Sequence, residues 1–252
     1  MANVLGIDVS KWNGVMDFGK ARQAGARFCY IRAGSIDNVT GKCYEDSQFH
    51  RNKVEAVKHM PVGYYWYFRP NHDPVKQANY FADLMRGLDW DLPPVVDVEA
   101  DGGLLPGIVR DRLKAGVNAL RLRVLVHPMV YTRGAWWNEN VTSDPAFGAL
   151  DLWIARYTTL SKPWGNPYDT ANLKPRDWSS WRVWQWSADG NGRGVEFGAP
   201  PPPLADESMD LNYFNGDEAA FYAWIGWPQP VTLEQRVVDL EKRVKILEDI
   251  HG

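Results

Sequence analysis

Pro94-Val95-Val96-Asp97-Val98-Glu99 is a short β-branched run that ends in two carboxylates. Runs of this kind alternate along the chain with helix-like stretches, a pattern typical of βα units and a parallel sheet. Asp97 and Glu99 are two residues apart, so on a strand both side chains point to the same face. Catalytic groups of a parallel barrel project from the carboxyl ends of its strands. The run therefore predicts a strand that carries an acid pair to the functional end of the fold.

Along the rest of the chain, the same pattern predicts eight strands and four helices. The predicted strands are Val4–Asp8, Arg27–Ala33, Pro61–Tyr67, Pro94–Val98, Val124–Tyr131, Leu152–Arg156, Ser180–Trp186 and Met209–Asn212. The predicted helices are Asp17–Ala24, Asp46–Lys58, Asp73–Leu88 and Leu105–Arg123. The connections 161–179 and 188–208 are rich in Pro, Gly, Asp and Trp and predict loops.

The predicted fold class is therefore α/β, an irregular TIM-like (β/α) barrel with helices missing in its second half. A doubly wound open sheet is the alternative, because strand count does not establish closure.

The C-terminal residues carry a separate signal. Residues 227–231 contain a stiff Pro-Gln-Pro linker, and 232–252 predict an amphipathic helix that starts at a Thr232–Gln235 capping box. Its apolar positions follow a heptad with Leu at d and Val at a: Leu233, Val237, Leu240, Val244 and Leu247. We expect a coiled coil that makes a homo-oligomer through residues 233–250; a helix docked on its own barrel is the alternative.

Composition limits the classes of function. With 252 residues, 45% of them hydrophobic, the chain can bury one large core. A net charge of −3 without a Lys/Arg run predicts no nucleic-acid partner, and no apolar run reaches membrane-spanning length, so we expect no membrane insertion. The N-terminus has no signal-peptide pattern, so we expect a protein made in the cytoplasm. Cys29 and Cys43 predict two free thiols.

Four carboxylates lie next to apolar runs, where the mouth of a barrel is expected: Asp8, Asp97, Glu99 and Asp210. Asp97 and Glu99 share one face of a partly desolvated mouth, where their charges repel each other. This repulsion raises the pKa of at least one of the two. A protonated acid beside an ionised carboxylate is what cleavage of a glycosidic bond requires.

A metal site is the chemical competitor, because clustered carboxylates also suit Mg²⁺ or Ca²⁺. The five histidines are dispersed and form no ligand pair of the H-E-x-x-H type. The sequence also lacks a G-x-S-x-G elbow, a P-loop and a strand-linked G-x-G-x-x-G. We therefore expect acid/base chemistry with no metal and no cofactor.

Several short motifs together resemble glycoside hydrolase family 25, the lysozymes often found as bacteriophage endolysins and bacterial autolysins. In chain order they are Gly6-Ile7-Asp8-Val9-Ser10, Gly63-Tyr64-Tyr65, Asp97-Val98-Glu99, Tyr131-Thr132, Leu152-Trp153-Ile154-Ala155-Arg156-Tyr157, Trp184-Gln185-Trp186-Ser187 and Asp210-Leu211-Asn212. The resemblance covers about residues 4 to 216 and implies a catalytic barrel over residues 1–226. At the end of the second strand the chain departs from the family, with Arg32-Ala33-Gly34-Ser35 where Lys-Ala-Thr/Ser-Glu-Gly is frequent.

What the resemblance implies is retaining hydrolysis of the β-1,4 bond between N-acetylmuramic acid and N-acetylglucosamine in bacterial peptidoglycan, after holin-type release to the wall. Glu99 would be the general acid/base, and Asp97 would orient the 2-acetamido group of the substrate or attack directly. Asp8 and Asp210 would complete the acidic mouth. The implied substrate-binding residues are Tyr65, Tyr67, Arg32, Tyr131, Tyr157 and Trp186. A chitinase-like hydrolase and a wall-binding structural module are the alternatives.

Overall fold

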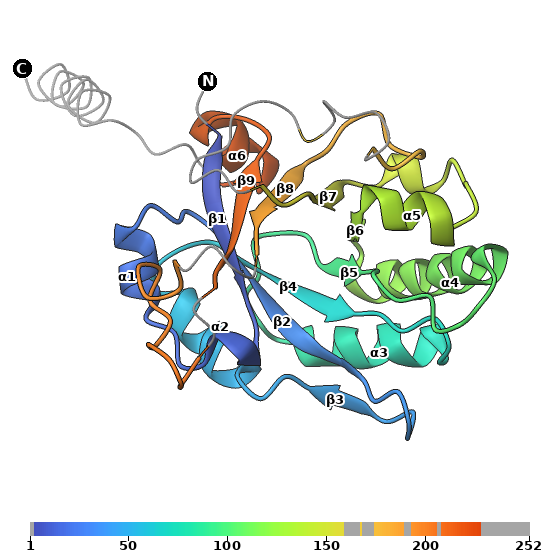
Figure 1. The fold of residues 1–252 in the computed structure, drawn as a ribbon, viewed down its shortest axis with the longest axis horizontal. Coiled ribbons are helices and arrows are strands. Elements are labelled where there is room, and N and C mark those ends of the chain that lie inside the picture. Colours follow the sequence, from blue (N-terminus) through green and yellow to red (C-terminus); the bar gives the residue numbers. More distant parts are fainter. Residues whose placement is uncertain (1–2, 159–166, 168–173, 189–192, 206–207, 228–252) are drawn as a thin grey trace, which may run out of the picture.

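Eight strands close into a ring in the computed structural model of this chain (Figure 1). The structure describes residues 3–158, 167, 174–188, 193–205 and 208–227. The strands are β1 (Val4–Val9), β2 (Cys29–Ile36), β3 (Cys43–Glu45), β4 (Val62–Tyr67), β5 (Val95–Asp97), β6 (Met129–Arg133), β7 (Leu152–Ala155), β8 (Val183–Ser187) and β9 (Asp210–Phe214). Their order is β1-β9-β8-β7-β6-β5-β4-β2, and pairing of β1 with β2 closes the ring. The predicted barrel is confirmed, and the open sheet is wrong.

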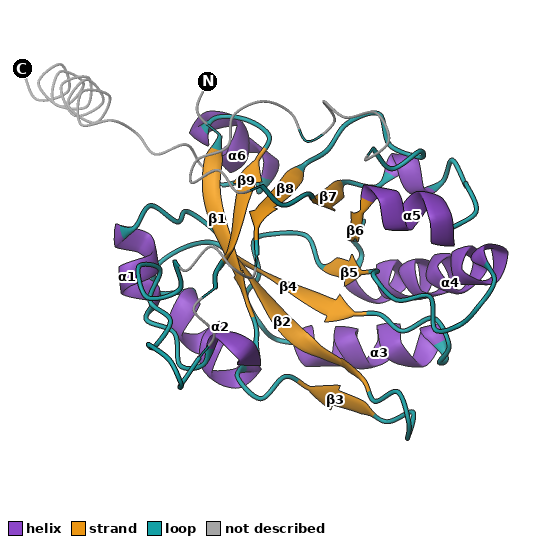
Figure 2. Ribbon diagram, in the orientation of Figure 1, coloured by secondary structure: helices purple, strands orange, loops and turns teal. Residues whose placement is uncertain are grey.

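Helices surround these strands in Figure 2. They are α1 (Phe18–Gln23), α2 (Phe49–Ala56), α3 (Pro74–Met85), α4 (Pro106–Val124), α5 (Gly134–Asn140) and α6 (Glu218–Trp224), with 3-10 turns at Lys11–Asn13 and Phe147–Ala149. Asp17, Asp73 and Asp217 cap α1, α3 and α6 by accepting backbone N–H bonds. The four predicted helices are confirmed; α5 and α6 were not predicted, because each has only seven residues.

The last strand is antiparallel to its neighbours, although the sequence predicts a parallel sheet. β9 is antiparallel to both β1 and β8, because the connection after β8 returns to the sheet from the end at which β8 finishes. Its first residue, Asp210, is therefore level with Asp8 of β1, while Phe214 pairs with Val4 at the opposite end.

The start of one strand differs clearly from the prediction, and one short strand was not predicted. The sixth strand begins at Met129 and not at Val124, because α4 continues through Val124 and ends at Leu125 in the left-handed conformation (φ 60°). The short β3 was missed; it pairs antiparallel with β2 as the arm of a hairpin. No helix among the described residues is long and apolar enough to cross a membrane. The predicted C-terminal helix and most of the linker lie outside the described residues.

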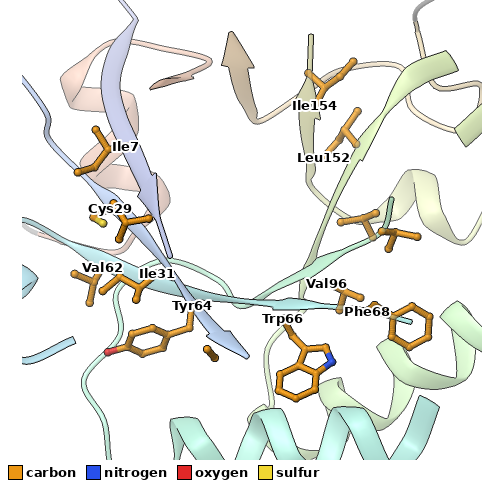
Figure 3. Packing of buried hydrophobic residues seen from close by; sticks show 14 of the residues in the cluster. Ile7, Cys29, Ile31, Val62, Tyr64, Trp66, Phe68, Val96, Leu152 and Ile154 are labelled. Atoms are coloured by element: carbon orange, nitrogen blue, oxygen red, sulfur yellow. The ribbon is translucent and has the colours of Figure 1, made fainter. Parts of the chain in front are cut away.

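Side chains that alternate along the strands form two apolar clusters. The cluster outside the ring packs against the helices; Figure 3 shows Ile7, Cys29, Ile31 and their neighbours in it. Trp66 points from β4 toward α3, where it stacks on Phe81 at 6.0 Å and donates to Gln77. Because this cluster covers the outer face of consecutive strands, it fixes which residues turn inward.

The second cluster fills the interior of the ring. It includes Phe28, Tyr30, Val95 and Trp153, and Phe221 of α6 closes the end away from the carboxylates by stacking on Phe28 at 5.4 Å. Large interior rings require small neighbours, since protein interiors are close-packed. A Cβ atom on Gly63 would lie 2.5 Å from the ring of Tyr30 and 2.7 Å from Cβ of Leu92. Glycine at this position is therefore a packing requirement of the barrel.

Replacing Gly63 by Ala is expected to destabilise the protein by about 1–3 kcal/mol, because the Tyr30 ring or the strand has to move. Denaturant unfolding monitored by Trp fluorescence measures the change. The matched control is Gly107→Ala in α4, where the new Cβ meets only an ordinary 3.8 Å contact and unfolding should be unchanged or slightly later. Equal stability of Gly63→Ala and the wild type would contradict this account of the interior.

Candidate active site

The structure brings four carboxylates to one cavity at the end of the barrel opposite α6. Asp8 comes from β1, Asp97 ends β5, Glu99 follows two residues later, and Asp210 begins β9. Inward alternation along the strands places all four on the interior side. The expected place of Asp210 at the carboxyl end of a parallel strand is wrong; it lies at the mouth because β9 is antiparallel.

Two amide side chains hold Asp8. Gln185 and Asn212 both donate to its Oδ2 atom, at 2.9 Å and 2.8 Å. The orientation of each amide is set by a second donor: the Tyr131 hydroxyl donates to Gln185 Oε1 at 2.7 Å, and Trp153 Nε1 donates to Asn212 Oδ1 at 2.8 Å. Two relays that start at aromatic side chains therefore turn both amide N–H groups toward one carboxylate oxygen.

Burial and hydrogen bonding act on Asp8 in opposite directions. The residue is only 3% exposed, and burial raises the pKa of its carboxyl to about 7, helped by the charge of Glu99. The hydrogen bonds from Asn212 and Gln185 lower the pKa and limit this rise. Asp8 therefore changes charge near neutral pH.

Asp97 and Glu99 form a second pair with unequal exposure. Burial raises the pKa of Asp97 well above its usual value, and the charge of Glu99 adds to the rise, while Arg32 opposes it. Burial also raises the pKa of Glu99, whereas Arg133 and Arg32 lower it. Asp97 is 5% exposed and its buried Oδ1 atom has no hydrogen-bond partner among the described residues. The cavity thus holds Glu99, the less buried acid, together with Asp97, whose buried Oδ1 atom is an acceptor without a partner among the described residues.

Most of the predicted substrate-binding residues surround these acids. Tyr65, Tyr67, Arg32, Tyr131 and Tyr157 line the cavity. The Arg32 guanidinium lies 5.0 Å from the centroid of the Tyr67 ring, and the hydroxyls of Tyr131 and Tyr157 are 3.4 Å apart. Aromatic faces combined with hydroxyl and guanidinium donors suit a sugar, which presents apolar ring faces and many polar groups.

Trp186 does not belong to this wall, and its predicted role is wrong. Alternation along β8 turns Gln185 inward and Trp186 outward, where the indole is 1% exposed and stacks on Tyr213 at 5.5 Å. Gln185, which no prediction singled out, takes the interior position next to it. The alternation of side chains along β8 was the signal in the sequence that assigns these two neighbours to opposite faces.

Other lining residues were also missed by sequence reasoning. They are Ser10, Trp12, Trp153 and Ala188. Trp12 is 60% exposed on the 3-10 turn after β1, with Lys11 Nζ 4.7 Å from its ring centroid. The chain has thirteen tryptophans, and only the fold distinguishes the exposed Trp12 from buried indoles such as Trp153.

Comparisons with known proteins agree with this geometry. The family model described as "Glycosyl hydrolases family 25" matches residues 7–195. "Lysozyme M1" of Streptomyces globisporus is 30% identical over 234 residues, which cover 88% of this chain and 71% of that protein. An N,O-diacetylmuramidase of Arthroderma benhamiae is 27% identical over 183 residues, covering 67% and 75% of the two chains. The crystal structure of a lysozyme from Streptomyces coelicolor superposes with a TM-score of 0.69 at 27% identity, covering 89% of this chain and 98% of that one.

The raised pKa of Asp8 predicts a pH dependence of stability. The folded protein keeps a proton on Asp8 that the unfolded chain releases above pH 3.8, so this contribution is complete below that pH and is lost as the pH rises through about 7. Relative to Asp8→Asn, the wild type should lose on the order of 2 kcal/mol of unfolding free energy between pH 5 and pH 8. Urea titrations of both proteins at the two pH values measure it. A constant difference between them would refute the raised pKa.

Proposed function

The chain belongs to the glycosyl hydrolases of family 25, and on this basis we propose that it is a lysozyme that hydrolyses peptidoglycan. The bond cleaved is the β-1,4 linkage between N-acetylmuramic acid and N-acetylglucosamine. The observation that carries the proposal is the presence in one aromatic-lined cavity of Glu99 and of the buried Oδ1 atom of Asp97, which has no partner among the described residues. Relatives with the names lysozyme and N,O-diacetylmuramidase support the choice of substrate.

Glu99 is the proposed general acid/base. Burial raises its pKa, which favours the protonated form that a proton donor needs, and its partial exposure in the cavity leaves the carboxyl accessible to a glycosidic oxygen. The proton moves from Glu99 to the leaving oxygen as the bond to the anomeric carbon breaks. Glu99, now ionised, then removes a proton from the water that completes hydrolysis.

Asp97 is the proposed partner of the substrate's 2-acetamido group. An acetamido N–H would supply the hydrogen bond that Asp97 Oδ1 lacks among the described residues. Oriented in this way, the acetamido oxygen attacks the anomeric carbon from the side opposite the leaving group, and water later opens the resulting ring. Two displacements at the same carbon give net retention of configuration.

Asp8 and Asp210 would shape the charge of the cavity around this pair. Asp8 Oδ2 already accepts two hydrogen bonds, so this oxygen is held by the protein and is poorly placed to attack a sugar. Once Asp8 is ionised, above about pH 7, its charge and that of Asp210 would stabilise positive charge that develops on the sugar ring in the transition state.

Substitution of Glu99 by Gln should lower the rate of clearing of purified cell walls by about 10²–10⁴-fold, since the proton donor is lost. The matched control is Glu139→Gln, an exposed carboxylate on α5, which should clear walls at the wild-type rate. Circular dichroism establishes that both variants are folded.

Analysis of the new reducing ends completes this test. Muramic acid at the reducing ends is the result expected of a muramidase. Glucosamine ends would identify a different sugar hydrolase of the chitinase-like type, and binding to walls without release of soluble fragments would identify a structural module. Undiminished clearing by Glu99→Gln would remove Glu99 from its proposed role.

We also propose that residues 233–250 join copies of the chain, on the strength of the Leu and Val heptad in their sequence. Light scattering of the full chain should give a multiple of the 28.7 kDa chain mass, and a variant that ends at Trp227 should give a single-chain mass. Two or more barrels in one particle would bind a polymeric wall with higher avidity. Single-chain masses for both proteins would refute the oligomer.

A further inference from the structure

We propose that Arg32 binds the 3-O-lactyl group of the muramic acid whose glycosidic bond is cleaved, and that this contact selects muramic acid over glucosamine at that position. The inference rests on the proposed muramidase function and adds the residue that reads the one substituent by which these two sugars differ. It follows from the unpaired state of Arg32, from its support by Tyr67, and from its place along the barrel wall.

Arg32 is the only cation among the described residues that line the cavity. Its Nε atom is buried and has no hydrogen-bond partner in the part of the chain that the structure describes, and none of the ion pairs there includes it. A buried donor without a partner costs free energy, more so when it is charged. A ligand with an acceptor at this position would remove that cost.

Two carboxylates act on Arg32 through their charge, Asp97 at the cavity and Asp46 behind it, and the oxygens of Asp46 are already occupied. Asp46, whose charge acts on Arg32, accepts the backbone N–H of Lys11 at 3.1 Å through Oδ2 and that of Gln48 at 2.9 Å through Oδ1. Asp46 therefore contributes a long-range attraction to the guanidinium, while both of its oxygens serve to hold the loops around it. The donors of Arg32 are left for the cavity.

Tyr67 supports the guanidinium in a defined orientation. The Arg32 Cζ atom lies 5.0 Å from the centroid of the Tyr67 ring, within the range of a cation–π contact. A guanidinium that rests on an aromatic face keeps its N–H groups at its edge, where they suit a planar, two-oxygen acceptor. Arg69 lies at the same 5.0 Å from that ring but does not line the cavity, so it provides a matched comparison.

The order of groups on the barrel wall matches the order of groups on the sugar. Asp97 pairs with Tyr67 across β5 and β4, and Arg32 pairs with Tyr65 across β2 and β4, so Arg32 lies two strands from Asp97 and, level with Val95, two residues deeper in the barrel. In muramic acid the anomeric carbon, the 2-acetamido group and the 3-O-lactyl group follow one another around the ring. With the anomeric carbon at Glu99 and the acetamido group at Asp97, the lactyl group extends toward Arg32.

The lactyl group has the chemistry that a guanidinium binds. In glycan strands without peptide it ends in a carboxylate, and in the intact wall it ends in an amide carbonyl, so both forms present an acceptor. Glucosamine has only a hydroxyl at the same carbon, which is shorter and uncharged. The guanidinium of Arg32 would stay unpaired with glucosamine, and such a loss discriminates strongly between substrates.

A pair of matched substrates tests the inference. The first is peptide-free glycan with alternating N-acetylglucosamine and N-acetylmuramic acid; the second is the same glycan after its lactyl carboxylates are reduced to alcohols. The ratio of kcat/KM for the native glycan to that for the reduced glycan is measured for wild type, Arg32→Gln, Arg32→Lys and Arg69→Gln. We expect the wild-type ratio to be about 10 or more and that of Arg32→Gln to approach 1. Arg69→Gln should keep the wild-type ratio.

The ratio of the two kcat/KM values distinguishes recognition of the lactyl group from a general effect of the Arg32 charge. If Arg32 only adjusts the pKa values of Asp97 and Glu99, Arg32→Gln will slow both glycans equally and leave the ratio unchanged, which would overturn the inference. Arg32→Lys keeps the charge but loses the planar, forked set of guanidinium N–H donors, and should give an intermediate ratio. This variant decides the question if Arg32→Gln fails to fold. A wild-type ratio of 1 would also overturn the inference while leaving the muramidase proposal intact. Cleavage of neither glycan by wild type would refute both.

Discussion

Antiparallel pairing of β9 with β1 and β8 is the constraint on which this molecule depends. It joins β1 to β8 in the ring that the pairing of β1 with β2 closes, and through its register it sets Asp210 level with Asp8 at the mouth. The same strand supplies Asn212, whose amide donates to Asp8. At the other end Phe214 packs against Phe221 of α6 in the barrel interior. One strand therefore joins the closure of the fold, the apolar floor and the polar mouth.

The barrel produces its chemistry by separating an apolar interior from a polar mouth along the same strands. At the α6 end of the barrel, large aromatic side chains fill the interior. At the mouth, carboxylates are buried enough for their pKa values to rise. Amide relays hold Asp8, whereas Asp97 Oδ1 and Arg32 Nε have no partner among the described residues. The cavity thus combines groups that the protein holds in place with unpaired groups, and the unpaired ones are complementary to an acetamido N–H and an acidic substituent.

Much of this arrangement follows from local pattern, and the rest depends on contacts between distant segments. Apolar runs predict the strands well, because burial of both faces demands them. The direction of β9 depends on the path of the preceding connection, which has no periodic signal. An aromatic residue in a motif suggests sugar binding, which favours Trp186, whereas the parity of β8 gives the inward position to Gln185. The contact of Arg32 with Tyr67 joins residues on different strands, and no local pattern encodes it.

The central claim is that the reacting bond lies at Glu99 with the acetamido group at Asp97. A crystal structure of the folded Glu99→Gln variant with a bound N-acetylglucosamine–N-acetylmuramic acid tetrasaccharide tests it most directly. We expect the glycosidic oxygen within about 3.2 Å of the substituted side chain at position 99 and the acetamido nitrogen within hydrogen-bonding distance of Asp97. A glycosidic oxygen out of reach of position 99 and next to Asp8 or Asp210 would contradict it.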